Sequence, residues 1–154
     1  SVFDVMRLCG WPAEQVPQNV GGYKLDTETG SLPIFIKYEA SQYGDRFLNP
    51  GEIEWFSKNN RSLKSNEFRW LLDGTERTPE WQNRHFVPIF IRRKAEEQEK
   101  SYYFVGSAVA LDDVRASVNP GEDGSESKVV ISTLKLIKPV DPELYRHLTG
   151  KSAL

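Results

Sequence analysis

Strand-like segments dominate this chain, and no long helical segment links one strand to its neighbour. The segments rich in β-branched and aromatic residues, each bounded by turn residues, are 21–26, 32–38, 87–93, 102–111 and 128–137. Adjacent parallel strands need a crossover of about a dozen residues or more, usually a helix. The pattern therefore disfavours a doubly wound parallel sheet. It predicts an α+β fold that is β-rich, with a bent, largely antiparallel sheet or small barrel and short flanking helices.

The remaining segments predict short helices and polar loops. In 49–60, Asn49 is a good helix cap, Pro50 suits the first helical position and Glu52 suits the first turn, so we expect a helix there. Other helices are expected over 1–11, over 65–74 with Ser65 as cap, and over 142–148 between Asp141 and Gly150. Loops or turns are expected at 74–84, 95–100 and 116–127.

The composition indicates one domain over residues 1–154 and limits what it can bind. With 154 residues, 38% of them hydrophobic, and a net charge of −2, a polyanion can be bound only by a local patch. Cys9 is the single cysteine, which favours a reducing, cytoplasmic setting. No segment has the length and apolarity of a membrane span, so no membrane partner is expected. The chain begins at Ser1 inside an apparent helix, so we expect a fragment of a longer protein.

The sequence offers little for catalysis. Gly21 and Gly22 lack the spacing of a dinucleotide or phosphate-binding loop, and Cys9 lies on the apolar face of its expected helix. We therefore expect no catalytic residues, no metal site and no cofactor. An enzyme would require four titratable residues to meet in one cleft: Asp45, Glu52, Glu54 and His85.

One stretch, WFSKNNRSLKS at 55–65, concentrates residues that bind nucleic acids. Four cations lie between positions 58 and 69 against one acid, Glu67. Lysine and arginine bind phosphates, and Asn and Ser also hydrogen-bond base edges. The predicted DNA-binding residues here are Lys58, Asn59, Asn60, Arg61, Ser62, Lys64, Ser65 and Arg69. Trp55 and Tyr43 are the candidates for stacking on a base. The open alternative is that Trp55 anchors the core and the cations form a solvated rim.

A second basic cluster follows the strand at 87–93. Arg92 and Arg93 extend the predicted DNA-binding set, although alternation places them on opposite faces of the strand. The alternative is an edge strand protected by charge.

Several motifs, in order, resemble a known family. QNVGGYKLD, LPIFIKYE, YGDRFLNPGEIEW, the RSLKS block, VPIFIRRK and YYFVG are similar to a C-terminal domain of unknown function attached to bacterial DEAD-box-like helicases. Such helicases often carry a phospholipase-D-like or HNH-type nuclease domain. The similarity covers roughly residues 1–150, while the loops 74–84 and 119–127 look like local insertions.

The resemblance implies a restriction or phage-defence system, with an ATP-dependent helicase, and in some cases a nuclease, as parent protein. The chain would be excised from the C-terminus of that protein. We expect a non-catalytic DNA-recognition module, and the analogy with barrel domains that read modified bases extends this to modified DNA. The alternative is a docking module that couples the helicase motor to a nuclease domain or partner subunit. Exposed aromatic residues and the 116–127 loop would then form the interface.

Overall fold

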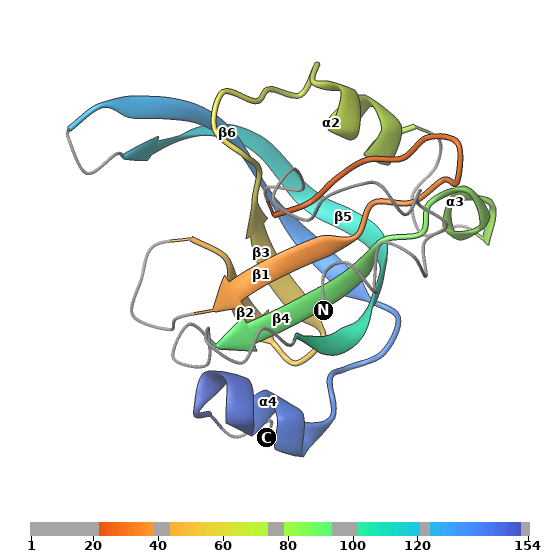
Figure 1. Ribbon diagram of the computed structural model, residues 1–154, viewed down its shortest axis with the longest axis vertical. Helices are drawn as coiled ribbons and strands as arrows, with labels where there is room; N and C mark the ends of the chain where they lie inside the picture. Colours follow the sequence, from red (N-terminus) through yellow and green to blue (C-terminus); the bar gives the residue numbers. More distant parts are fainter. Residues whose placement is uncertain (1–21, 39–43, 74–78, 94–101, 121–123, 152–154) are drawn as a thin grey trace, which may run out of the picture.

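A computed structural model describes residues 22–38, 44–73, 79–93, 102–120 and 124–151, and its main element is one curled sheet (Figure 1). The six strands lie in the order β1-β4-β5-β6-β3-β2. Only the β1–β4 pair is parallel, and the other neighbours are antiparallel. The strands are β1 (Ile34–Tyr38), β2 (Arg46–Asn49), β3 (Glu52–Phe56), β4 (Pro88–Arg93), β5 (Tyr103–Pro120) and β6 (Glu126–Leu136).

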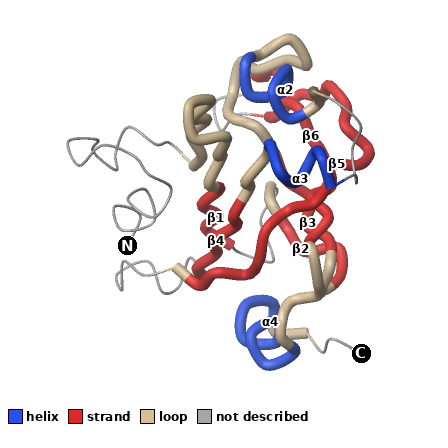
Figure 2. The backbone as a smooth tube through the Cα atoms, turned by 90° about the vertical axis from the view of Figure 1, so that its right-hand side faces the viewer, coloured by secondary structure: helices blue, strands red, loops and turns tan. Residues whose placement is uncertain are grey.

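The long strand β5 bends the sheet into half a barrel. Its first residues pair with β4, and from Ala108 onward it pairs with β6. Register shifts interrupt the β5–β6 ladder between Ala108 and Ala110 and between Asp112 and Arg115. Bulges of this kind bend and twist a strand locally. Figures 1 and 2 show the strands curling around the interior from two directions, which confirms the predicted β-rich α+β fold with a bent sheet.

The two similar segments of the sequence lie side by side. β1 and β4 pair in parallel, with Ile34 beside Ile89 and Ile36 beside Ile91. Phe35 stacks on Phe90 with ring centroids 5.4 Å apart. The segments LPIFIKY and VPIFIRR, each with two isoleucines flanking a phenylalanine, thus occupy matching positions in neighbouring strands.

Three short helices flank the sheet: α2 (Asn66–Leu71), α3 (Pro79–Arg84) and α4 (Pro142–Thr149). Asp141 caps α4 by accepting hydrogen bonds from the amides of Glu143 and Leu144, and Gly150 ends it in the left-handed conformation, as predicted. None of these helices, which are all that the described ranges contain, has the length and apolarity to cross a membrane. The expected helix 1–11 and the turn 95–100 lie outside the described residues.

The prediction of a helix over 49–60 is wrong, because this segment begins with the β2–β3 hairpin. The side-chain oxygen of Asn49 accepts a hydrogen bond from the amide of Gly51 at 2.8 Å, which closes a turn. Ile53 and Trp55 are both 1% exposed, whereas Glu52, Glu54 and Phe56 are only partly buried. This alternation has the period of a strand, and it outweighs the capping signal.

The 74–84 loop prediction is also wrong from residue 79 onward. Pro79 begins α3, and Trp81 is completely buried. The indole nitrogen of Trp81 donates to the carbonyl of Leu71 at 2.9 Å. One tryptophan therefore ties a helix of polar composition to the core.

Most of the predicted 116–127 loop is strand. β5 continues to Pro120 and β6 begins at Glu126, with Ala116 paired to Val130 and Val118 to Lys128. Cross-strand hydrogen bonding here overrides a composition typical of loops. Residues 121–123 lie outside the described ranges.

Candidate functional site

The predicted DNA-binding stretch leaves β3 as a connector, which we define as residues 57–65. Its first part lies against β6: the amide of Ser57 donates to the carbonyl of Val130 at 2.9 Å, and the amide of Arg61 donates to the carbonyl of Lys128 at 3.2 Å. The hydroxyl of Ser57 also accepts from the amide of Val130 at 2.8 Å. These hydrogen bonds anchor the connector to the sheet. They fix the backbone that carries its polar side chains.

The second part of the connector forms a turn before α2. The hydroxyl of Ser65 accepts from the amide of Ser62 at 2.9 Å, and the hydroxyl of Ser62 accepts from the amide of Lys64 at 3.2 Å. Ser65 occupies the predicted cap position of α2, but its side chain makes no hydrogen bond to the helix. Its hydroxyl instead stabilises the turn of the connector through the amide of Ser62.

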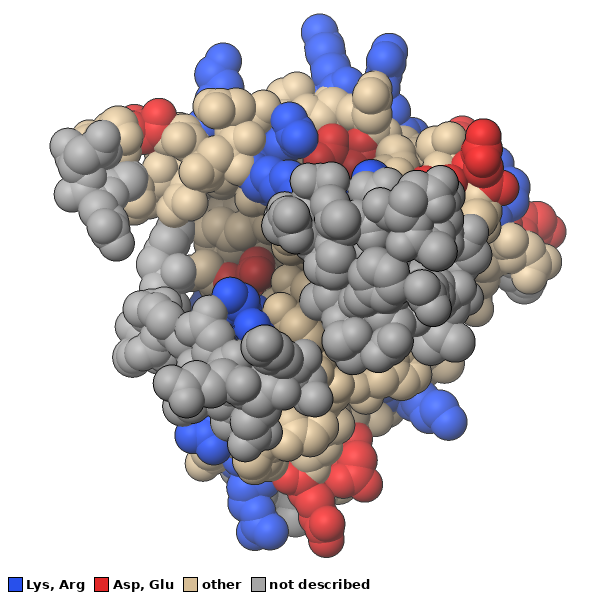
Figure 3. Space-filling view, in the orientation of Figure 1, with Lys and Arg blue, Asp and Glu red and all other residues tan. Residues whose placement is uncertain are grey.

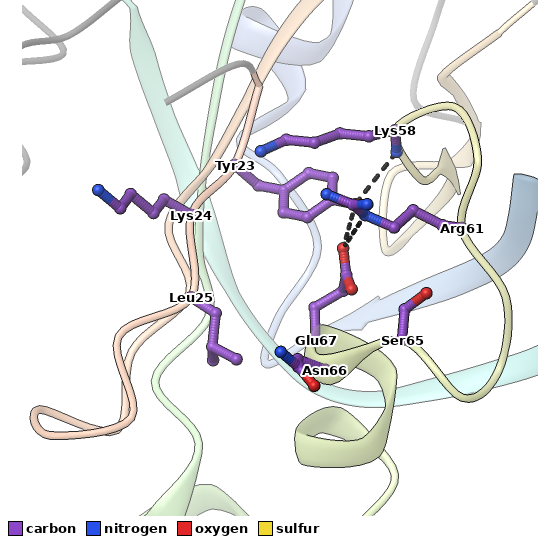
Figure 4. A pocket seen from close by; sticks show the side chains of 8 residues that line it. All are labelled: Tyr23, Lys24, Leu25, Lys58, Arg61, Ser65, Asn66 and Glu67. Carbon is purple, nitrogen blue, oxygen red and sulfur yellow. Dashed lines mark hydrogen bonds and ion pairs between the residues drawn. The ribbon is translucent and has the colours of Figure 1, made fainter. Parts of the chain in front are cut away.

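A pocket opens where the connector meets α2 and the segment before β1 (Figure 4). Its volume is about 470 Å³. It is lined by Tyr23, Lys24, Leu25, Lys58, Arg61, Ser65, Asn66 and Glu67. Figure 4 shows Lys24 and Arg61 on opposite sides of Tyr23.

A hydrogen-bonded network forms the inner wall of this pocket. The same carboxylate oxygen of Glu67 accepts from the Tyr23 hydroxyl at 2.7 Å and from Nε of Arg61 at 3.0 Å. The Tyr23 oxygen in turn accepts from the amide of Lys58 at 3.1 Å. Glu67 is 7% exposed and Tyr23 is 4% exposed. The network joins three segments of the chain and neutralises the buried acid with an arginine.

The cations of the pocket repel one another. The ammonium of Lys58 lies 4.6 Å from the centre of the Tyr23 ring. Burial, together with the nearby charges of Arg61 and Lys24, lowers the pKa of Lys58, while Glu67 opposes this effect. Burial and the hydrogen bond to Glu67 raise the pKa of Tyr23, which keeps its phenol neutral. An anion bound here would relieve the repulsion between the cations.

Further polar and basic side chains surround the pocket. Asn59, Asn60, Ser62, Lys64 and Arg69 are exposed. Lys128 on β6, whose carbonyl accepts from the amide of Arg61, is exposed as well. The side-chain amide nitrogen of Asn119 on β5 donates to the side-chain oxygen of Asn59 at 3.4 Å, which links the connector to the β5–β6 hairpin. Lys and Arg side chains gather at the end of the molecule that carries α2 (Figure 3).

The aromatic residues predicted to stack on bases do not join this surface. Trp55 is 1% exposed, and its ring packs against Tyr23 and Phe68 with centroids 5.1 and 5.8 Å away. Its faces are therefore occupied, and the role of core anchor is the correct one. Tyr43 lies outside the described residues.

The second basic cluster is also separate from the pocket. Figures 1 and 2 place the end of β4, which carries Arg92 and Arg93, well away from α2. Arg92 is 8% exposed, and its guanidinium lies 4.7 Å from the centre of the Tyr102 ring. The alternative of a charged edge strand is wrong, because β4 lies between β1 and β5.

His85, considered for a catalytic cleft, is a core residue. It is 3% exposed, and its ring stacks on Trp81 with centroids 4.4 Å apart. Its two ring nitrogens lie 2.8 and 2.7 Å from the carbonyl oxygens of Trp81 and Trp70.

Sequence reasoning missed Tyr23, Lys24 and Lys128 as members of the basic surface. Tyr23 and Lys24 precede the connector by more than thirty residues, and only the fold brings them to it. No local pattern in GGYKLD indicates that Tyr23 and Lys24 line one pocket with the connector.

Comparison with known proteins identifies the class of domain. The sequence matches the family described as a domain of unknown function (DUF3427) over residues 1–148, so the chain belongs to that family. A search of curated proteins found no match. Among solved structures, the chain is similar to the SRA domain of SUVH5 in complex with hemimethylated CG DNA. The TM-score is 0.47 at 15% identity, over 92% of this chain and 87% of that one.

Proposed function

We propose that this chain is a non-catalytic DNA-recognition module. The supporting observation is the concentration of cations around one anchored connector, in a chain whose net charge is −2. These cations are Lys24, Lys58, Arg61, Lys64, Arg69 and Lys128. Contacts between cations and phosphates supply most of the affinity of non-specific DNA binding.

The connector also carries groups that read base edges. Asn59, Asn60 and Ser62 are exposed beside the cations, and such side chains donate to and accept from bases. With Trp55 buried, stacking on that ring plays no part in the proposal. Recognition would combine phosphate contacts with hydrogen bonds from the connector.

The resemblance of the sequence to helicase-associated domains sets the biological context of this proposal. The module would hold DNA for the helicase motor, and for a nuclease domain where one is present, of a bacterial cytoplasmic restriction or defence protein. The most specific version of this proposal is that the module senses modified DNA. The proposal rests on the cations and polar side chains around the connector.

Binding of labelled duplexes, measured by fluorescence anisotropy at several salt concentrations, tests the proposal. Unmodified, methylated, hydroxymethylated and phosphorothioate duplexes of one sequence should be compared. We expect affinity that falls steeply with salt, because bound phosphates release counterions. Absence of binding to all four duplexes at low salt would overturn the proposal, whereas preference for one of them would identify the modification.

A second function, docking onto the helicase motor, has its own observation. An apolar groove of about 470 Å³ lies between the start of β5, the segment 137–141 that follows β6, and α4, with Phe104 56% exposed and Ile137 60% exposed along it. Exposed apolar side chains gathered in a groove suit a protein partner. Capture of the parent protein's own motor by this chain, lost with Phe104→Ser and kept with Lys58→Ala, would favour docking.

A further inference from the structure

The cations around the connector differ in how firmly they are held. The amide of Arg61 donates to the carbonyl of Lys128 at 3.2 Å, and its Nε donates to the carboxylate of Glu67 at 3.0 Å. Lys64 and Arg69 are exposed, and their charged ends form no ion pair with any residue that the structure describes. Arg61 is therefore fixed at its backbone and at its guanidinium, so it has less side-chain entropy to lose when it binds a ligand.

The carboxylate that holds Arg61 is itself fixed. Glu67 is 7% exposed, and the oxygen that accepts from Arg61 also accepts from the Tyr23 hydroxyl at 2.7 Å. The Tyr23 oxygen in turn accepts from the amide of Lys58 at 3.1 Å. Figure 4 shows the Glu67 carboxylate directed at Tyr23 and at the guanidinium of Arg61. A chain of hydrogen bonds that begins at the backbone therefore sets the direction of this guanidinium.

The outer end of the Arg61 guanidinium suits a neutral pair of acceptors better than a phosphate. Nη1 and Nη2 take no part in the hydrogen bond that Nε makes, and the side chain is 39% exposed. A phosphate bound at this end would lie close to the carboxylate of Glu67, and the two anions would repel each other. Neutral acceptors avoid that repulsion and still match the planar fork of the arginine.

Guanine is the base whose major-groove edge offers two acceptors side by side. Its O6 and N7 accept together from one arginine, whereas adenine presents a donor beside N7. The exposed cations Lys64, Arg69 and Lys128 suit the phosphates on either side. Because a groove lies between two rows of phosphates, the charge of Arg61 still adds to the salt dependence of binding.

We infer that Arg61 reads a guanine in the major groove of bound DNA, with Glu67 and Tyr23 as positioning residues. This inference rests on the proposed function, and it adds the selection of one base to the contacts with the backbone. The exposed cations hold the duplex, while the fixed guanidinium of Arg61 donates to O6 and N7 of the guanine.

Three duplexes of one sequence, with guanines along both strands, test the inference by anisotropy. The first carries guanine, the second 7-deazaguanine in its place, and the third inosine in its place. 7-Deazaguanine lacks the N7 acceptor, whereas inosine keeps O6 and N7 and lacks only the amino group of the minor groove. We expect the guanine and inosine duplexes to bind about tenfold more tightly than the 7-deazaguanine duplex, as loss of part of a bidentate contact implies.

Two results would overturn the inference and leave the proposed function intact. One is equal affinity for all three duplexes. The other is a loss of affinity with inosine as large as that with 7-deazaguanine, because the readout would then lie in the minor groove.

A conservative change at Arg61 locates the preference. Arg61→Lys keeps the charge and removes the planar fork, so it should abolish the preference for guanine over 7-deazaguanine. Arg69→Lys is the matched control, because it makes the same change at an exposed arginine of the same surface. It should leave the tenfold preference unchanged. A uniform loss of affinity for all three duplexes in Arg61→Lys would make Arg61 a phosphate contact and overturn the inference.

Two further variants test the positioning residues. Tyr23→Phe removes the hydroxyl that holds Glu67, and Glu67→Gln removes the charge that holds Arg61. Both should reduce the preference for guanine to about threefold, because the guanidinium is then less firmly oriented. Glu67→Gln should also raise the affinity for the 7-deazaguanine duplex, since no anion then opposes a phosphate at Arg61. A role in stability alone would leave the preference unchanged, and that result in both variants would refute the positioning role.

The remaining outcomes separate the inference from the proposed function. Binding of none of the duplexes would refute both. A preference for guanine that survives Arg61→Lys would place the readout on another residue and overturn the assignment to Arg61, while DNA recognition itself would stand.

Discussion

The two ends of the molecule carry cavities of the same size and opposite chemistry. The pocket at the α2 end and the groove at the α4 end each have a volume of about 470 Å³. Among the described residues, three cations and a buried carboxylate line the pocket, whereas Phe104 and Ile137 border the groove. The described lining of the groove includes one cation, Lys138, and one acid, Asp141, which caps α4. The volume of a cavity therefore indicates little about its ligand. The number and sign of the charged side chains that line the cavity indicate more.

The pocket and the groove also differ in how their polar groups are held. In the pocket, Glu67 connects Tyr23 on one segment with Arg61 on another, so its wall is part of the tertiary structure. In the groove, the apolar side chains of Phe104 and Ile137 are exposed. A substitution in the pocket wall should therefore affect stability and binding together, whereas a substitution in the groove should affect association alone.

The largest effect is expected from Glu67→Ala. It leaves the buried Tyr23 hydroxyl without its acceptor and Arg61 without its counterion. We expect the free energy of unfolding to fall by about 2–3 kcal/mol in urea denaturation. Glu67→Gln, which keeps an acceptor for Tyr23, should lose less than half of that. An alanine variant as stable as the wild type would show that the network does not hold the wall together.

The next largest effect is expected on the affinity for DNA. Lys58→Ala combined with Arg61→Ala should weaken binding of a duplex about thirtyfold, at roughly 1 kcal/mol for each lost contact. The slope of log affinity against log salt should decrease by about two. Phe104→Ser should change neither quantity. If the groove variant weakened binding as much as the pocket variant, the contrast between the two ends would fail.

A third effect concerns the base of the connector. Asp45 accepts a hydrogen bond from the amide of Phe56 at 2.7 Å, immediately before the connector begins. Burial raises the pKa of Asp45 from 3.8 to about 6, a shift that this hydrogen bond opposes and the charge of Glu54 supports. The folded chain thus holds this proton more tightly than the unfolded chain. The stabilisation is complete below about pH 4 and is lost as the pH rises through about 6.

Asp45→Asn removes that charge and keeps an acceptor for Phe56. We expect it to raise the free energy of unfolding by about 1 kcal/mol at pH 7.5, and by much less at pH 4.5. Thermal unfolding across this pH range measures the difference. A gain that does not depend on pH would mean that burial of the charge is not its cause.

Periodic patterns in the sequence predicted much of the sheet. Segments 32–38, 87–93, 102–111 and 128–137 contain β1, β4, the first part of β5 and most of β6, because runs rich in β-branched and aromatic residues suit buried strands. In Glu52–Phe56 the alternation of acidic and apolar residues indicates a strand, whereas the capping signal of Asn49 and Pro50 indicates a helix. Tertiary contacts explain the other two wrong predictions. Trp81 anchors a helix of polar composition, and strand pairing extends β5 into a segment whose composition is typical of a loop.

The candidate site was predictable only in part, for a related reason. Spacing identified Lys58, Arg61 and Lys64, because a local cluster of cations is visible in one segment. It gave no information on which partners fold against them. Tyr23 and Glu67 lie 44 positions apart, and the hydrogen bond between them depends on the path of the whole chain.

The smallest effect on stability is expected in the groove. Phe104→Ser and Ile137→Ser change side chains that are 56% and 60% exposed, so the free energy of unfolding should shift by less than about 0.5 kcal/mol. If the chain docks onto a helicase motor as proposed, their effect should appear in capture of that motor, which Lys138→Ala at the same groove should leave unchanged. If both serine variants retained capture, the groove would have no role in docking. Among the described residues, the basic connector would then be the one surface with a proposed ligand, which is DNA.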